Sequence, residues 1–301
     1  MTRRGLWIAA LLTPAALILL VFMALPMAGA FLGAFRSFNG AAPGPWVGFA
    51  NFQDVLLTPP FAAVTWAALG HNLFVFATLM VVQNGLAYLI AFGLLKALPG
   101  HRVHQVIVFL PVVLSAVVVG FLWKLFLHPL FGLVNAALVA VGLPEWALSW
   151  LGEPETALPS LVLVNTWHWL GFPALVFLAG MQRIPQEVIE AARLDGAGDG
   201  ALLRRIIWPL VAPSVTILTV LTFIGAMNWF ELPYVMTGVN GSPGGATDVL
   251  GLYFYRTAFG AATSGLQDFG RGSALAVLMF LLVGGVSAVA LHLLRRREME
   301  L

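Results

Sequence analysis

The sequence predicts an all-α membrane protein with six transmembrane helices. Of its 301 residues, 60% are apolar and only 9% are charged, whereas soluble domains carry about a quarter charged residues. A helix needs roughly 20 mostly apolar residues to cross a bilayer, and six windows meet that requirement. One compact charged segment, residues 183–207, separates two of them. The windows run over about 7–34, 71–95, 103–127, 158–181, 208–232 and 273–294.

The composition also excludes several classes of protein. A soluble fold this apolar would lack the polar side chains that cover a surface in water. The net charge is only +2, and the longest run of like charge is the three arginines at 295–297, which is too little positive charge for a nucleic-acid partner. The absence of cysteine excludes disulfides, thiolate metal sites and cysteine catalysis. We therefore expect membrane lipid to surround the chain.

The first window admits two interpretations. Arg3 and Arg4 precede the apolar run, and Ala28-Gly29-Ala30 resembles a cleavage site, so the window could be a secretory signal peptide. The apolar core of a signal peptide is typically about 7–15 residues long, and the run over 7–34 is longer. We therefore favour a retained first transmembrane helix.

Prolines lie within several windows. Pro14 and Pro26 fall in the first, Pro111 in the third and Pro173 in the fourth. Transmembrane helices tolerate proline where neighbouring groups satisfy the freed backbone. Each window is therefore kept as one span, and the whole chain, 1–301, is expected to form a single transmembrane domain.

The distribution of Lys and Arg predicts the orientation. With six spans, the two termini share one side, and that side carries 11 of the 15 basic residues. Positive residues gather on the cytoplasmic side of membrane proteins. We therefore expect cytoplasmic termini, a cytoplasmic 183–207 segment, and outer loops at 35–70, 128–157 and 233–272.

The charged segment has the pattern of a helix, a turn and a second helix. Pro185 and Glu187 suit the first turn of a helix, where acidic side chains favour the positive end of the dipole. A second short helical run is expected over 201–207. Three glycines break the pattern between them: Gly196, Gly198 and Gly200. From the pattern alone, the segment is either a linker resting on lipid headgroups or a surface presented to a partner in water.

The same segment resembles a signature of the inner-membrane subunits of binding-protein-dependent ABC importers, E-A-A-x3-G-x9-I-x-L-P. One position departs from it, because Trp208 stands where Leu is usual, and this leaves the packing of the last turn open. The resemblance implies that the segment docks on a separate ATPase and couples ATP hydrolysis to movement of the spans. The residues implied are Glu190, Ala191, Ala192, Asp195, Gly196, Ile206 and Pro209.

Motifs elsewhere are similar to the carbohydrate-uptake branch of that family, the maltose and glycerol-phosphate type. The matching stretches begin at Gly48, Asn72, Leu110, Gly132, Trp167, Thr237 and Gly270. The Thr-Gly-Gly-Gly-Pro element of that branch is stretched by an insertion before Pro243. The resemblance implies a type I ABC importer permease fold and a sugar or sugar-like solute that moves into the cytoplasm of a bacterial or archaeal cell.

The resemblance also implies a set of partners. They are a second permease subunit, a cytoplasmic dimer of ATP-binding subunits, an extracytoplasmic solute-binding protein and a small carbohydrate. The glycines at 196–200 lack the lysine of a phosphate-binding loop. We therefore expect no cofactor in this chain, with ATP and Mg bound by the ATPase, and no enzymatic activity.

Polar and aromatic side chains inside the windows are the candidates for a solute path, because polar groups are costly in lipid. Each also has a structural alternative: a bond between helices, a place in the interfacial aromatic belt, or simple packing. The resemblance places the end of the fifth window beside the solute site. The candidates are Asn228, Trp229, Glu231, Gln83, Tyr88 and Trp167.

Two other functions are weighed against the importer subunit. A membrane enzyme would use Glu231, Asp248 and the histidines, but these lack catalytic or metal-ligand spacing, and we predict no metal site. A secondary transporter driven by an ion gradient would show more intramembrane carboxylates and an internal repeat. The solute itself stays open, although the scarcity of basic residues within the windows favours a neutral sugar over a phosphoester.

Overall fold

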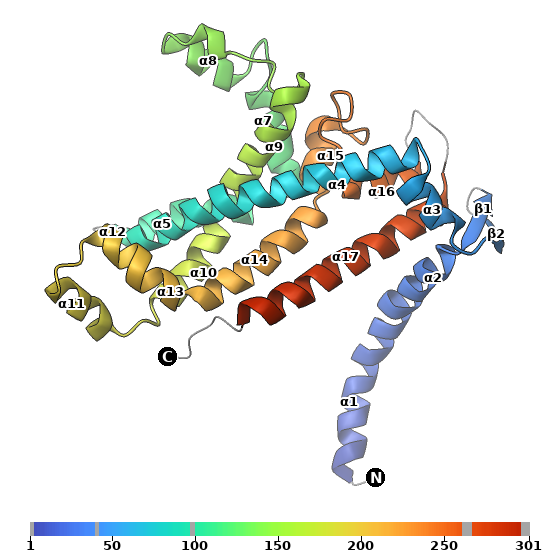
Figure 1. Ribbon diagram of the computed structural model, residues 1–301, viewed down its shortest axis with the longest axis horizontal. Coiled ribbons are helices and arrows are strands. Elements are labelled where there is room, and N and C mark those ends of the chain that lie inside the picture. Colours follow the sequence, from blue (N-terminus) through green and yellow to red (C-terminus); the bar gives the residue numbers. More distant parts are fainter. Residues whose placement is uncertain (1–2, 40–41, 97–99, 261–266, 296–301) are drawn as a thin grey trace. The chain divides into compact units, whose positions relative to one another are not determined.

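The computed structural model describes residues 3–39, 42–96, 100–260 and 267–295 (Figure 1). The described residues belong to two compact units. The first is built from the stretches 1–66 and 254–281, and the second from 67–253 and 282–301.

The first unit starts with one long helix. It consists of α1 (Arg3–Leu19), the π-helical turn η1 (Leu20–Ala24) and α2 (Leu25–Gly33). The π turn immediately precedes Pro26, whose ring cannot continue an ordinary hydrogen-bonded turn. The stretch Ala10–Gly33 has a mean hydropathy of 2.5, and its most apolar window buries nothing within the chain. Its side chains therefore face surroundings other than this chain.

A small hairpin, which the sequence did not predict, follows this helix within the otherwise helical fold. Strands β1 (Arg36–Asn39) and β2 (Ala42–Trp46) pair antiparallel. Pro43 and Pro45 in β2 mask the strand pattern in the sequence, yet an edge strand can hold proline because its N–H groups need no partner. Helix α3 (Ala50–Leu57) comes next.

An arginine joins the pieces of the first unit that are far apart in the sequence. Arg271 lies in the first turn of α17 (Phe269–Arg295). Its Nε and Nη2 atoms donate to Asp54 Oδ2 at 2.9 and 2.8 Å, and Nη1 lies 3.1 Å from Asp268 Oδ2. The guanidinium also stacks 4.1 Å above the ring of Phe61. Arg271 thus holds α17 to α3 and to the start of α4.

The second predicted span is one helix with a π turn in its middle. It runs through α4 (Phe61–Thr78), η2 (Leu79–Gln83) and α5 (Asn84–Leu95). The helix begins at Phe61, well before the predicted start at residue 71. Residues 61–70 are compatible with a helix, but they were assigned to the predicted outer loop 35–70, so this part of the helix was missed.

The third and fourth spans are broken helices. α6 (His101–Phe109), η3 (Leu110–Val113) and α7 (Ala116–Phe126) bend by 97° near Ser115, whose side chain caps α7. α9 (Pro154–Trp169) and α10 (Gly171–Met181) bend by 48°. A side chain at Gly171 would collide with the Val108 carbonyl, so the kink brings α10 against α6.

The charged segment forms α11 (Gln186–Leu194), α12 (Asp199–Ala201), η5 (Leu202–Ile207) and α13 (Trp208–Leu210). The second helical run therefore begins at Asp199, not at Ala201, and most of it is π-helical. After a bend of 74°, α14 (Ala212–Met227) follows. The fifth helix thus ends five residues short of the predicted 232, because Asn228 and Trp229 leave the helical path.

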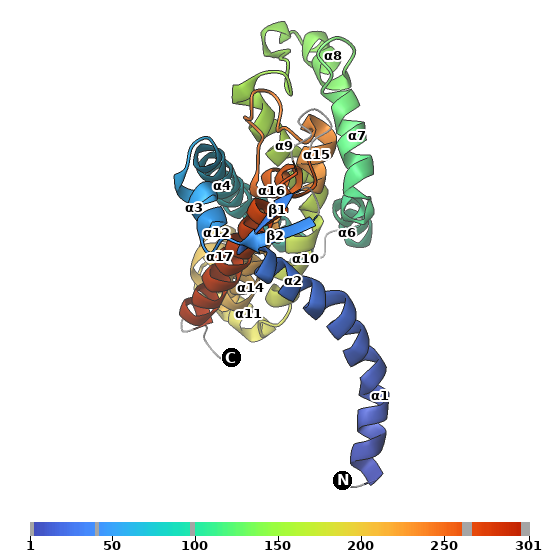
Figure 2. The same cartoon turned by 90° about the vertical axis from the view of Figure 1, so that its right-hand side faces the viewer.

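Four further elements belong wholly or partly to the second unit. They are α8 (Leu133–Ala140), η4 (Pro144–Trp146), α15 (Glu231–Thr237) and the start of α16 (Leu250–Phe259). α5 packs on α10, and α7 packs on α15. Figures 1 and 2 show α8 and α11 at opposite ends of this unit.

A fully buried amide ties three helices of this unit together. Asn72 in α4 donates from Nδ2 to the Ala226 carbonyl near the end of α14, at 2.6 Å. Its Oδ1 accepts from the N–H of Leu250 at the start of α16, at 2.9 Å. Asn72 therefore supplies a partner to the N–H of Leu250 at the start of α16, and it adds a shorter bond to the Ala226 carbonyl, which also accepts from the N–H of Trp229 at 3.5 Å.

By length and composition, three helices of the described chain are suited to cross a membrane, and up to six are if each bent pair counts as one span. The unbroken ones are Ala10–Gly33, Phe61–Leu95 and Phe269–Leu294.

Candidate functional site

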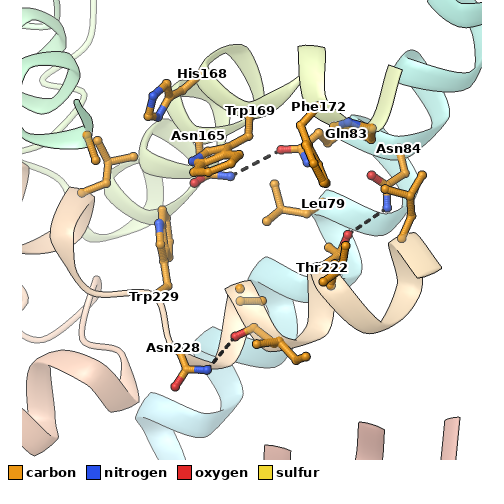
Figure 3. A pocket seen from close by; sticks show the side chains of 18 of the residues that line it. Leu79, Gln83, Asn84, Asn165, His168, Trp169, Phe172, Thr222, Asn228 and Trp229 are labelled. Carbon is orange, nitrogen blue, oxygen red and sulfur yellow. Dashed lines mark hydrogen bonds between the residues drawn. The ribbon is translucent and has the colours of Figure 1, made fainter. Parts of the chain in front are cut away.

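The second unit contains a cavity of about 670 Å³ (Figure 3), within the range of about 300–1,000 Å³ usual for small-molecule sites. Three irregular places in the helices form its wall: the π turn η2, the kink between α9 and α10, and the stretch between α14 and α15. Its polar lining residues are Gln83, Asn84, Asn165, His168, Thr222, Asn228 and Glu231. Its aromatic ones are Trp169, Phe172, Trp229 and Phe230.

The π turn η2 explains why the continuous helix α4–η2–α5 contributes three neighbouring residues to the cavity wall. In a regular α-helix, residues 79 and 84 would point about 140° apart. The wider turn of η2 places Leu79, Gln83 and Asn84 on the cavity together. Single π turns inside α-helices are frequently found at functional sites.

Two amide interactions order the cavity wall. Asn165 Nδ2 donates to Gln83 Oε1 at 3.4 Å, and Asn84 Nδ2 donates to Thr222 Oγ1 at 3.1 Å (Figure 3). Asn84 Oδ1 is buried and has no hydrogen-bond partner. Asn84 Oδ1 is therefore a hydrogen-bond acceptor of a lining residue that nothing in the described chain satisfies, and Nδ1 of His168, another lining residue, is buried without a partner as well.

The charges of the cavity are few. Glu231 is its one acidic residue, and no Lys or Arg lines it among the residues that the structure describes. The rings of Trp229, Trp169 and Phe172 supply broad apolar faces. The cavity thus combines amides and aromatic faces, a mixture suited to a neutral polar molecule with apolar faces.

The charged segment is held in a defined shape at one end of the unit. α11 ends in a Schellman motif, in which the N–H of Ala197 bonds the Ala192 carbonyl at 2.9 Å and the N–H of Gly196 bonds that of Arg193 at 3.0 Å. Gly196 has φ +86°, a conformation that favours glycine. The sharp turn inferred for Gly196 is therefore present.

One face of α11 is apolar and exposed. Leu194 is 89% exposed and Val188 is 37% exposed, and Ala191 lies between them at helical spacing. Ala192, in contrast, is buried against the chain's own core, and its part in coupling stays a prediction. Glu190 is exposed and accepts a hydrogen bond from Gln186 at 2.7 Å.

Two contacts join α5 to the charged segment. The hydroxyl of Tyr88 donates to the Leu203 carbonyl at 2.8 Å, and its ring meets Trp208 edge-on at 5.2 Å. Lys96 Nζ lies 2.6 Å from Asp199 Oδ2. The Tyr88 contact explains how tryptophan is accommodated at 208.

The hydrogen bond from Lys96 holds the pKa of Asp199 below its ordinary value, and attraction to Lys96 and Arg193 adds to the effect. Because the folded pKa is lowered, the contribution of this pair to stability is present at neutral pH. It is lost only as the pH falls through that lowered pKa. The pair is solvent-exposed, so its contribution is small.

Comparison with known proteins identifies the family. Residues 5–300 match the family described as binding-protein-dependent transport system inner membrane component. The chain belongs to this family. This inner-membrane component is 32% identical to the sulfoquinovosyl glycerol transport system permease protein of Agrobacterium fabrum, over 96% of the chain and 90% of the relative. It is also 32% identical to the trehalose/maltose transport system permease protein of Thermococcus litoralis, over 96% and 93%.

A solved structure shows the same fold. A chain of the bacterial alginate ABC transporter, solved in complex with an alginate pentasaccharide-bound periplasmic protein, matches with a TM-score of 0.82 and 24% identity over 98% of this chain and 96% of the other. The type I ABC importer permease fold is therefore confirmed. Family membership also favours an importer permease over the secondary transporter and the membrane enzyme.

The inner-membrane component brings four of the six predicted path residues to the cavity: Gln83, Asn228, Trp229 and Glu231. Trp167 is not among the lining residues, and its ring packs on Trp123 at 5.5 Å. Tyr88 lies beside the charged segment instead. Ile206 is half-buried and packs against the core of this unit, and Pro209 is the second residue of the short helix α13 (Trp208–Leu210).

Several lining residues escaped the sequence-based prediction, notably Asn165 and Thr222. A single threonine or asparagine in an apolar run gives little signal, because either can bond its own helix or a neighbour. The kink after Trp169 exposes this wall, and the sequence marks it only by the Gly171-Phe172-Pro173 triplet.

Replacing Tyr88 with phenylalanine is expected to weaken the join between α5 and the charged segment. The ring contacts persist, but the hydrogen bond to Leu203 is lost, at about 1 kcal/mol. We expect uptake per ATP hydrolysed to fall severalfold with unchanged insertion in the membrane. An unchanged ratio of uptake to hydrolysis would show that this bond transmits nothing. Phe177, whose ring also contacts Tyr88, supplies the control through Phe177→Leu, which keeps the hydrogen bond.

Proposed function

We propose that this chain is the permease subunit of an ATP-driven ABC importer that moves a sugar or sugar-like solute into the cytoplasm. The observation that carries the proposal is the pairing of an amide- and aromatic-lined cavity with an exposed helical face at the far end of the same unit. Membership of the family supports it, as do relatives whose names specify sulfoquinovosyl glycerol and trehalose/maltose transport.

The exposed face of α11 is the proposed docking site for the cytoplasmic ATPase. Leu194, Val188 and Ala191 offer an apolar surface, and Glu187 and Glu190 add negative charge beside it. Apolar anchors with a charged rim are typical of protein interfaces. In this proposal ATP and Mg bind to the partner, and this chain carries no catalytic residue.

The remaining partners complete the importer. A second permease subunit would cover the apolar helix Ala10–Gly33, which buries none of its window within the chain. A solute-binding protein would deliver the solute at the end of the unit opposite α11. The distribution of basic residues supports cytoplasmic termini in a bacterial or archaeal inner membrane.

The contacts suggest how movement passes from the docking site to the cavity. Asn84 and Tyr88 lie one turn apart on α5. Asn84 lines the cavity, and Tyr88 bonds the charged segment. A displacement of that segment by the ATPase would therefore shift or rotate the helix that forms one cavity wall. Such coupling requires contacts that differ between the two states of the importer.

The test is reconstitution. The chain is co-expressed with the ATPase and second permease encoded beside it, isolated through a tag on this chain, and placed in proteoliposomes with the solute-binding protein. We expect the ATPase to co-purify and labelled sugar to accumulate only with ATP. Sugar uptake driven by an ion gradient, or uptake by this polypeptide alone, would overturn the proposal.

Replacing Gly196 with aspartate is expected to uncouple hydrolysis from uptake. A non-glycine residue at φ +86° strains the turn by about 1 kcal/mol or more, and the added carboxylate lies beside Asp195. We expect a fall in uptake of about fivefold or more with normal membrane insertion, measured as uptake against ATP hydrolysis. Gly198→Ala is the control, since Gly198 has an ordinary φ of −73°. Equal uptake by both variants would show that the turn at Gly196 has no part in coupling ATP hydrolysis to uptake.

A further inference from the structure

We propose that the cavity selects uncharged, hydroxyl-rich solutes and rejects anionic ones, through Asn84 and Glu231. The inference rests on the proposed function, because it names the class of solute that the cavity accepts. Three features of the cavity support it: its charge, one unsatisfied acceptor, and its aromatic faces.

The charge of the cavity opposes an anion. A carboxylate, phosphate or sulfonate that enters must lose water, and it then needs a cationic partner or several N–H donors. Among the residues that the structure describes, neither Lys nor Arg lines the cavity. Glu231 lies in the first turn of α15 and adds a carboxylate to the lining of the cavity. An anionic solute therefore meets repulsion without compensation.

The acceptor in the wall favours a hydroxyl. The Nδ2 group of Asn84 is engaged by Thr222 Oγ1 at 3.1 Å and by the sulfur of Met80 at 3.2 Å. This fixes the amide so that Oδ1 is the atom left without a partner. A buried acceptor without a donor is destabilising. A sugar hydroxyl can supply that donor, whereas a carboxylate cannot.

The walls beside Asn84 suit a sugar ring. Figure 3 shows Trp229 and Phe172 on different sides of the cavity. The side-chain amides of Gln83 and Asn165, which are hydrogen-bonded to each other, lie nearby. Aromatic faces cover the apolar C–H surface of a ring, while amides serve its hydroxyl groups. A site built to bond a hydroxyl discriminates strongly against molecules that lack one.

The first experiment measures protection of a cysteine introduced by Gly225→Cys. The native chain contains no cysteine, Gly225 lines the cavity, and an added side chain there meets nothing within 4 Å. The assembled importer, without its solute-binding protein, is treated with an uncharged maleimide. The added solutes are matched pairs: glucose and glucuronate, galactose and galacturonate, trehalose and trehalose 6-phosphate.

We expect the neutral member of the pair that the preparation imports to slow alkylation at least fivefold. The acidic member should need at least tenfold higher concentration for the same effect. Gly85→Cys is the matched control, because Gly85 also has open space but does not line the cavity. Equal protection by both members of that pair, or no protection by an imported neutral sugar, would overturn the inference.

Variants then assign the selection to residues. Asn84→Leu should raise the half-protecting concentration of the neutral sugar at least tenfold. Leu89→Ala, a change at an exposed residue of α5 that does not line the cavity, should alter it little. Glu231→Gln should reduce the difference in half-protecting concentration between the neutral and the acidic member of the pair. Protection that is unchanged in Asn84→Leu would refute the role of the acceptor.

ATP-driven uptake, measured in the same preparations with the binding protein restored, separates this inference from the function on which it rests. Uptake without charge discrimination contradicts the selection alone. The absence of ATP-driven uptake contradicts the proposed function itself.

Discussion

Replacing Leu194 with glutamate is expected to abolish most ATP-driven uptake while the chain inserts normally. Leu194 is 89% exposed at the end of α11, so its substitution disturbs no packing within the chain. In the importer its burial against the ATPase would contribute about 1.5–3 kcal/mol, and a carboxylate in the same pocket would be desolvated without a partner. Together these effects predict a loss of at least tenfold in ATPase association and in uptake. The measurement is the amount of ATPase recovered with tagged permease.

Leu130 provides a matched control for this experiment. It is 90% exposed and lies three residues before the start of α8, and Figure 1 shows α8 and α11 at opposite ends of the second unit. Leu130→Glu therefore makes the same chemical change on an equally exposed leucine, and it should leave ATPase association unaltered. Full recovery of the ATPase with Leu194→Glu would show that α11 is not the docking surface.

Replacing Asn72 with leucine is expected to destabilise the second unit by roughly 2–3 kcal/mol, because two buried backbone groups lose a hydrogen bond. An unsatisfied group costs about 1–3 kcal/mol, and only the Ala226 carbonyl keeps another partner, the N–H of Trp229 at 3.5 Å. These groups are the Ala226 carbonyl and the N–H of Leu250. Leucine has a similar volume, so the loss reflects hydrogen bonding more than packing. Thermal aggregation of the detergent-solubilised complex should begin several degrees lower, with reduced yield.

Asn228→Leu is the comparison for that variant. Asn228 is also an amide that bonds a backbone carbonyl, that of Ile224 at 3.0 Å, but it is exposed and the bond lies within one turn. Its removal should change the aggregation temperature little. If both variants behave alike, the buried Asn72 links do not hold the ends of α14 and α16.

The membrane class and the identity of the charged segment could be predicted because each depends on a long, additive signal. Apolar windows sum over about 20 residues, and the segment from Glu190 to Pro209 combines spacing with residue type. The breaks at Ser115 and Leu170 could not be predicted in the same way. A proline or glycine in an apolar run is compatible with both a straight and a kinked helix, and packing of α10 on α6 decides between them.

The candidate site was predicted unevenly for a related reason. Asn228, Trp229 and Glu231 interrupt an apolar run together, so their position was visible. Asn165 and Thr222 are single polar residues whose partners, Gln83 and Asn84, are distant in sequence. Tyr88 was predicted as a solute-path residue, yet the fold shows that its hydroxyl reaches Leu203 and that it does not line the cavity.

The π turn at Leu79–Gln83 has a consequence for how such a chain can diverge. A π turn holds one residue more than the α turn that it replaces. Loss of a single codon there would restore a regular α turn and leave every later side chain of α5 facing its present direction. Asn84 and Tyr88 would keep their places, while the residues within the turn would shift along the cavity wall. Insertions and deletions in this short stretch can therefore alter one part of the wall without disturbing the rest of α5.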